Sequence, residues 1–114
     1  MSEIILRKWN GRIRTDDEQE YLEYVARTGV EDYTHTPGNL GYQIVIRTLG
    51  DGTSEVTALS WWKDMEVIRG FTGAEPEAAR YYPGDERFLL DRPETVEHHR
   101  VFAGVVHLSE KARA

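Results

Sequence analysis

Two adjacent histidines near the C-terminal end of this 114-residue chain are its best candidates for acid/base chemistry at neutral pH. His98 and His99 lie in a stretch typical of a β-strand, where neighbouring side chains point to opposite faces. The pair therefore cannot chelate one metal ion, but one imidazole can face a pocket and take a proton from a substrate. We predict that His98 does so, because Val96 and Phe102 on its own face would desolvate it, lower its pKa and keep it neutral. The alternative is that both histidines lie at the surface or at an interface.

The run Arg80-Tyr81-Tyr82-Pro83 places a cation beside two phenols. Arg80 can hold an anionic or phenolate group while Tyr81 donates a hydrogen bond to it. Both are therefore candidate catalytic residues. The competing interpretation is that this segment only seals the end of a helix against a sheet.

Aromatic residues make up 11% of the chain, which is generous for its length. They can line a concave site for a flat organic ligand, or they can simply fill the core and a dimer interface. The residues predicted to bind such a ligand are Trp9, Tyr42, Trp62 and Phe71. Trp61 and Trp62 are neighbours, so their side chains point to opposite faces if one strand continues through both.

The composition excludes several kinds of site. The chain contains no cysteine, which rules out disulfide bonds, thiolate metal sites and cysteine nucleophiles, and it has no P-loop, dinucleotide-binding fingerprint, HExxH motif or nucleophile elbow. Its net charge of −6, without a cluster of lysine or arginine, disfavours nucleic acid as a partner. No apolar run approaches the roughly 20 residues of a membrane span, and none near the N-terminus suits a signal peptide. We expect a cytoplasmic protein with no metal site, no cofactor and no membrane or nucleic-acid partner.

Four segments have the residue types and turn signals of β-strands. They are residues 3–13, 40–48, 54–61 and 95–107. Gly50-Asp51-Gly52 is a typical hairpin connection between the two middle strands. Gly11 marks a bulge or the end of the first strand.

Helical signals lie between these strands. Thr15 and Glu18 match a capping box, and apolar residues at helical spacing continue to residue 28, where Gly29 is a helix stop. Residues 30–39 are predicted to form a loop. Beyond the middle strands, residues 63–71 can form a short helix and residues 75–82 a further turn or two, followed by a polar turn.

The resulting order, β-α-β-β-α-β, predicts a single α+β domain of ferredoxin-like type over residues 1–114, with an antiparallel sheet. In a lone domain of this kind the helices cover one sheet face and the other meets water, so every second strand residue should be polar. The first strand departs from that pattern, because Ile4 and Leu6 oppose Ile5 and Trp9. We therefore predict that the second face is buried in a homodimer, the alternative being an ordinary fraction of exposed apolar residues.

Several stretches resemble the antibiotic biosynthesis monooxygenase (ABM) family of the dimeric α/β-barrel superfamily. They are RKWNGRI, YLEYVARTGVEDYTHTPGNLGYQIVIR, LSWWKDMEVIRGFTG, ARYYPGDERFLL and TVEHHRVF, which together span nearly the whole chain. The resemblance implies two ferredoxin-like protomers whose sheets face each other, with a pocket in each between sheet and helices. Some members are cofactor-free monooxygenases of polycyclic phenols. A related branch cleaves haem with an axial histidine from the second helical region, but residues 63–87 of this chain contain no histidine, so we expect weak or no haem degradation.

The resemblance also implies roles for two residues. Asn10 stands where first-strand polar pocket residues occur, and Trp62 stands where a pocket-wall tryptophan is found. The first hypothesis is therefore a cofactor-independent monooxygenase acting on a small or polycyclic phenol, with Asn10 and Arg80 positioning its oxygens and Trp62 stacking on its ring. His98 or a pocket tyrosine would deprotonate the substrate, and its electron-rich carbon would react with oxygen. The second hypothesis is a dimer of the same fold that binds a small ligand without turnover or is purely structural, since fold alone does not decide function.

Overall fold

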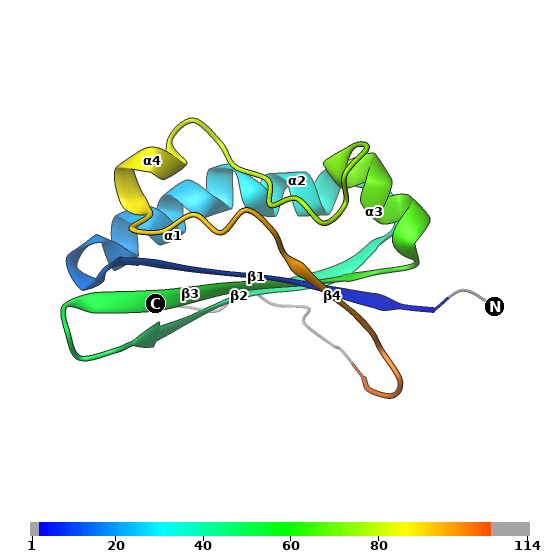
Figure 1. Ribbon diagram of the computed structural model, residues 1–114, viewed down its shortest axis with the longest axis horizontal. Helices are drawn as coiled ribbons and strands as arrows, with labels where there is room; N and C mark the ends of the chain where they lie inside the picture. Colours follow the sequence, from blue (N-terminus) through cyan, green and yellow to red (C-terminus); the bar gives the residue numbers. More distant parts are fainter. Residues whose placement is uncertain (1–2, 106–114) are drawn as a thin grey trace.

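All helices of the described chain lie on one face of an antiparallel sheet (Figure 1). The computed structural model describes residues 3–105. The strands are β1 (Ile5–Arg14), β2 (Asn39–Thr48), β3 (Thr53–Trp62) and β4 (Glu97–Arg100), in the spatial order β2-β3-β1-β4. The helical elements are η1 (Thr15–Asp17), α1 (Glu18–Arg27), α2 (Gly29–His35), α3 (Met65–Thr72) and α4 (Asp85–Phe88). This is the ferredoxin-like α+β arrangement predicted from the sequence.

β1 and β3 form the centre of the sheet and pair without interruption over the whole length of β1. Gly11 is therefore not the bulge or strand end predicted for it. The glycine instead gives room to a neighbour, because a Cβ atom at position 11 would lie 2.5 Å from Cη2 of the Trp9 indole. The register shift of the sheet lies in β2, between Asn39 and Gly41.

The predicted hairpin between β2 and β3 is confirmed. The Leu49 amide donates to the Thr53 carbonyl at 3.0 Å. Gly50 and Gly52 have φ values of 86° and 87°, a region that glycine adopts without steric cost. The Asp51 carboxylate accepts from the Thr53 amide at 3.0 Å, which fixes the turn.

The sheet face beneath the helices carries two apolar clusters. One consists of Ile13, Tyr21, Tyr24, Val56 and Phe88 and joins β1, β3, α1 and α4. The other consists of Ile5, Trp62, Ile68 and Phe71 and joins β1, β3 and α3. Arg7 lies on the same face of β1, between Ile5 and Ile13 along the strand, and only 4% of it is exposed. A cation thus takes a core position of the central strand.

The helical region after β1 is longer than predicted and is bent. Thr28 leaves helical geometry with φ −116° and ψ −90°, and its hydroxyl donates to the Tyr24 carbonyl at 3.0 Å. Gly29 does not stop the helix but begins a second one, α2, so the loop predicted for residues 30–39 was wrong over most of its length. The sequence rule failed here because glycine after a helix ends the chain's helical path only when it adopts a left-handed conformation, and Gly29 has no positive φ.

The predicted capping box at the start of this region does not form. Thr15 belongs to η1, and its hydroxyl lies 3.0 Å from the Ser54 hydroxyl on β3. The Glu18 carboxylate accepts from Ser54 and, at 3.1 Å, from Thr48. Both side chains therefore bond across to the sheet, in competition with the local backbone amides that a capping box would satisfy.

Only the first of the two short helices expected after β3 is confirmed. α3 is capped by Asp64, whose carboxylate accepts from the Val67 amide at 3.0 Å, and Gly73 ends it with φ 89°. Residues 75–82, predicted as a further turn or two of helix, are an irregular segment whose Ala78 pairs with Thr95. The last helix, α4, forms instead in the predicted polar turn. Within residues 3–105 no helix is long and apolar enough to cross a membrane.

The last strand is shorter than predicted. β4 covers only four residues and pairs with β1. The observed strand therefore begins after and ends before the predicted range of residues 95–107. Residues 106–107 of that range lie outside the described part of the chain. Phe102 is fully exposed.

The face of the sheet opposite the helices mixes apolar and polar side chains. It carries Leu6, Val45, Leu59 and Trp61 beside Lys8, Asn10, Gln43 and Thr57, as the pairing of β1, β2 and β3 requires. Ile4 and Val45 are each 42% exposed. Trp61 and Trp62 lie on opposite faces as predicted, with Trp62 completely buried under the helices.

Candidate functional site

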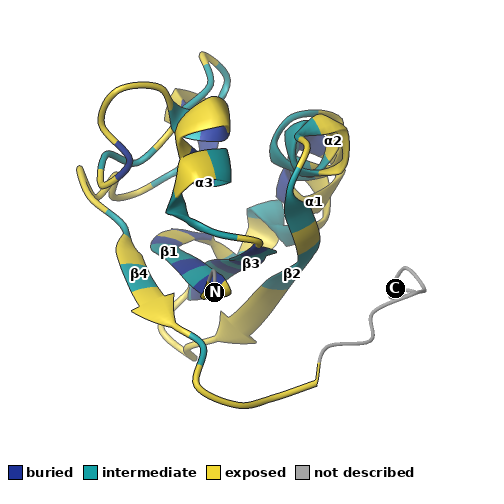
Figure 2. Ribbon diagram, turned by 90° about the vertical axis from the view of Figure 1, so that its right-hand side faces the viewer, coloured by how far each residue is buried: buried dark blue, intermediate teal, exposed yellow. Residues whose placement is uncertain are grey.

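A cavity of about 80 Å³ lies between the sheet and the helical layer. Side chains of β1, β2 and β3 form its floor. In Figure 2, α1 and α2 stand over the β2 side of the sheet, whereas α3 and the segment after it stand over the β4 side. Both groups contribute to the walls, so the cavity is lined by parts of the chain that are far apart in sequence.

Two aromatic pairs form the walls. The rings of Tyr33 and Phe71 stack with centroids 5.4 Å apart. The rings of Trp9 and Tyr81 meet edge to face at 6.3 Å, and the Trp9 indole donates to the Tyr81 hydroxyl at 3.0 Å. Tyr81 in turn donates to the Pro93 carbonyl. These contacts create a largely apolar space whose polar atoms are held in fixed positions.

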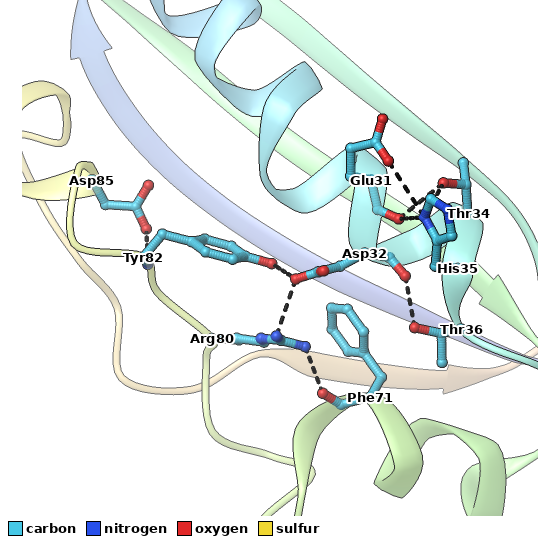
Figure 3. A network of polar contacts seen from close by, with 9 residues as sticks. All are labelled: Glu31, Asp32, Thr34, His35, Thr36, Phe71, Arg80, Tyr82 and Asp85. Carbon is cyan, nitrogen blue, oxygen red and sulfur yellow. Dashed lines mark hydrogen bonds and ion pairs between the residues drawn. The ribbon is translucent and has the colours of Figure 1, made fainter.

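Arg80 is joined to α2 and α3 by a network of polar contacts (Figure 3). Its Nη2 lies 3.0 Å from the Asp32 carboxylate, and its Nη1 donates to the Phe71 carbonyl at 2.7 Å. The Tyr82 hydroxyl donates to the same Asp32 oxygen, while the Tyr82 amide donates to Asp85 at 2.7 Å. The guanidinium also lies over the Phe71 ring, 4.8 Å from its centroid. The charge of Arg80 is thus balanced by Asp32.

Arg7 brings a second guanidinium to the cavity from below. Its Nη1 donates to the Pro76 carbonyl at 2.5 Å, and its Nη2 donates to the Ala78 carbonyl at 3.0 Å. These bonds hold the irregular segment after α3 onto the sheet. Burial lowers the pKa of Arg7, and the neighbouring Tyr33 and Glu77 act in the opposite direction.

His98 lies beside Arg7 on the adjacent strand and faces the same side of the sheet. Its Nε2 is 3.0 Å from Nη1 of Arg7. A guanidinium only donates hydrogen bonds, so Nε2 accepts and the neutral ring carries its proton on Nδ1. Burial lowers the pKa of His98, and the positive charge of Arg7 lowers it further. The desolvation expected from Phe102 does not contribute, because Phe102 is fully exposed.

The phenols around the cavity are hydrogen-bond donors and not bases. Burial raises the pKa of Tyr33 and of Tyr81, since removal from water disfavours the phenolate. It also raises the pKa of Tyr21 and Tyr82, and the neighbouring carboxylates Asp85 and Asp32 add to these effects. All four hydroxyls therefore keep their protons at neutral pH, which favours His98 over a pocket tyrosine as the candidate base.

Four of the residues predicted for the site line the cavity. They are Trp9, Phe71, Arg80 and Tyr81. His98 does not line it, but it touches Arg7, which does. Among residues 3–105, no three His, Asp or Glu side chains are grouped closely enough to hold a metal ion.

Three other predicted residues lie elsewhere. Asn10 is on the opposite face of the sheet, where its amide donates to the Thr57 hydroxyl at 2.8 Å, because the side chains of Trp9 and Asn10 alternate along β1. Trp62 is wholly buried, and its indole donates to the Ser60 hydroxyl at 2.8 Å. Tyr42 stacks on Tyr33 at 5.7 Å and does not line the cavity. The pocket-wall tryptophan of this chain is therefore Trp9.

Sequence reasoning missed Arg7 and Tyr33. The signal for Arg7 was present, because it follows Ile5 by two residues and precedes Trp9 by two, so strand alternation puts it on the buried face. Tyr33 was hidden because its segment had been assigned to a loop, and it lies in α2.

The fold places the chain among known structures, although no protein-family model matches the sequence and none of the curated proteins matches it either. A Bacillus cereus protein assigned to the antibiotic biosynthesis monooxygenases superposes with a TM-score of 0.62 at 11% identity, covering 93% of this chain and 100% of that one. SnoaB, a cofactor-independent oxygenase from Streptomyces nogalater, gives a TM-score of 0.53 at 18% identity and covers 96% and 100%. A heme-degrading protein from Mycobacterium tuberculosis gives 0.56 at 14% identity and covers 94% and 100%. At these identities the likeness concerns the fold.

Proposed function

Because the chain has the ABM fold, we propose that it is a cofactor-independent oxygenase acting on a small phenolic compound held between sheet and helices. The observation that carries the proposal is the position of His98, a neutral histidine in contact with a guanidinium that lines an aromatic cavity. A histidine whose pKa lies below its ordinary value of about 6.5 is deprotonated at neutral pH and can accept a proton.

The proposed reaction begins with proton transfer from the substrate hydroxyl to Nε2 of His98. Because His98 does not itself line the cavity, this step requires that Arg7 moves away from Nε2 so that the substrate oxygen can take its place. The ionised ring is then electron-rich enough to reduce oxygen, while the protonated phenols and the apolar walls keep water out. Overall, one phenol and one O2 give one quinone and one water, so the substrate supplies all the electrons and no other reductant is consumed.

The size of the cavity favours a single ring. An apolar cavity of about 150 Å³ is enough for benzene, and the cavity here is about 80 Å³. A monocyclic phenol therefore needs a modest widening, whereas a polycyclic one would have to displace the segment that Arg7 and Arg80 hold in place.

Oxygen uptake tests the proposal directly. We expect the protein to consume oxygen with at least one monocyclic phenol, in a one-to-one ratio with quinone formed and without hydrogen peroxide. Uptake at the rate seen without protein, or uptake that yields peroxide, would contradict the proposal, because autoxidation produces both.

A non-catalytic ligand-binding dimer is the second candidate. It is favoured by the fact that Arg80, Tyr81 and His98 all have protein partners already. This reading predicts that phenols bind, as followed by ligand-observed NMR, while oxygen consumption stays at the background rate.

We further propose that two copies of the chain pair through the open face of the sheet. The support is the apolar set on that face, Leu6, Val45, Leu59 and Trp61, which a lone domain would leave against water. Pairing of this kind buries like surfaces around a two-fold axis.

A further inference from the structure

The two arginines of the cavity differ in their charge balance. Arg80 lies 3.0 Å from the carboxylate of Asp32 and forms an ion pair with it. Only 4% of Arg7 is exposed, yet within residues 3–105 no carboxylate oxygen lies within 4.0 Å of its guanidinium nitrogens. Glu77 acts on it only from farther away. A buried cation without a paired anion is costly and therefore uncommon.

The hydrogen bonds of Arg7 leave part of its guanidinium unused. Of the five N–H donors of an arginine, two on Nη1 serve Pro76 and His98, and one on Nη2 serves Ala78. Nε–H and the second Nη2–H have no acceptor among the described residues. Because Arg7 also lines the cavity, these donors are available to a ligand there.

We propose that Arg7, and not Arg80, is the anion anchor of the cavity, and that the natural ligand is a monocyclic aromatic compound with an ionised oxygen, either a carboxylate or a phenolate. The inference builds on the proposed function by naming the charge of its ligand. A flat ring fits between the aromatic pairs Tyr33–Phe71 and Trp9–Tyr81. Its charged oxygen would pair with Arg7, which supplies the missing counter-charge.

Binding of matched small probes, measured by calorimetry without any turnover, tests this. Benzoate and benzamide have nearly the same shape and differ in charge, so we expect wild-type protein to bind benzoate at least about tenfold more tightly, the usual strength of a charge-assisted hydrogen bond. 4-Nitrophenol, titrated across the pH at which it ionises, reports the phenolate case. Preference for benzoate alone identifies the carboxylate, and preference for ionised nitrophenol alone identifies the phenolate.

Variants of the two arginines separate their roles. In Arg7→Gln the preference for the anion should fall to about twofold or less, whereas in Arg80→Gln, the matched control, it should persist. Arg7→Lys keeps the charge and should retain part of the preference for the anion. This variant provides the test if Arg7→Gln does not fold.

Two results would overturn the inference. One is equal affinity of wild-type protein for charged and neutral probes, or no binding of either. The other is a preference lost in Arg80→Gln and kept in Arg7→Gln. Neither result depends on oxygen uptake, so failure of the anion anchor and failure of the oxygenase proposal are distinguishable.

Discussion

Burial shifts the pKa of His98 and the pKa values of the tyrosines around the cavity in opposite directions. Burial acts on both kinds of group by disfavouring the charged form, and so it lowers the pKa of His98 and raises those of Tyr33 and Tyr81. Burial therefore favours a neutral imidazole at His98 and protonated phenols around the cavity. Arg7 adds a positive charge next to His98, which lowers its pKa further.

Replacement of His98 by alanine should lower turnover of an active phenol by roughly 100-fold or more, since a positioned base contributes ~10²–10⁴. Its neighbour His99 is the matched control, because it faces the other side of the strand and contacts Glu97 at 2.9 Å. Steady-state oxygen uptake of both variants provides the measurement. Equal activity of His98→Ala and wild type would show that the base is another group.

The lowered pKa of His98 also predicts how stability depends on pH. The unfolded chain binds a proton at this histidine near the ordinary value of 6.5, whereas the folded chain binds it only at lower pH. The unfolded state thus holds more protons in that window, so the free energy of unfolding should decrease as the pH falls below about 6.5. Urea unfolding at about pH 7 and about pH 5 measures the change. The decrease should be smaller in His98→Gln, and an equal decrease in both would refute the assignment.

At the scale of elements, the irregular segment after α3 depends on side chains that reach it from elsewhere. Arg7 bonds to its Pro76 and Ala78 carbonyls from β1, and Asp32 holds its Arg80 and Tyr82 from α2. The segment has no continuous backbone ladder of its own beyond the Ala78–Thr95 bridge and its flanking bonds. One wall of the cavity is therefore positioned by polar contacts between elements.

Loss of the Asp32 carboxylate should loosen that wall. Asp32→Asn weakens the contacts with Arg80 and Tyr82, and because both partners of the ion pair are more than a third exposed, we expect a loss of only about 1 kcal/mol in the free energy of unfolding. Amide hydrogen exchange at Ala78 and Ala79 should become faster. Glu31→Gln on the same helix, where Glu31 pairs with the exposed His35, is the control and should change neither quantity. Unchanged exchange in Asp32→Asn would contradict this account.

Predictions from the sequence succeeded where local interactions decide the structure, and they failed where contacts between distant segments decide it. The strands β1 to β3 and the hairpin of Gly50 and Gly52 were predictable, because alternation and turn chemistry are local. The capping box at Thr15 and the helix stop at Gly29 failed, because Ser54 on a distant strand competes for the first and a bent continuation replaces the second. Half of the predicted site residues line the cavity, because local patterns do not show which side chains from distant segments meet.

At the scale of the whole molecule, the sheet has one face committed to the helices and one left open. The covered face holds the cavity and both apolar clusters. The open face carries Leu59 and Trp61 on β3, one of the two inner strands. Separation of the two faces means that pairing of copies on one side leaves the ligand site on the other intact.

Sedimentation at low micromolar concentration should therefore give twice the chain mass of 13.1 kDa. Trp61→Glu places a charge among the apolar residues of the open face and should yield monomers. Leu22→Glu is the control, since Leu22 is an exposed apolar residue of α1 on the helical side. A monomeric wild-type protein, or a Trp61→Glu variant that stays dimeric, would contradict pairing through this face.

The close approach of Trp9 to Gly11 gives a residue outside the cavity control over its width. The indole lies over the backbone of the glycine, where even one methyl group would overlap it. Any larger residue at position 11 must therefore move the Trp9 ring, which lines the cavity. Position 11 thus acts as a spacer for Trp9, so a substitution there would change the shape of the cavity although Gly11 itself does not line it.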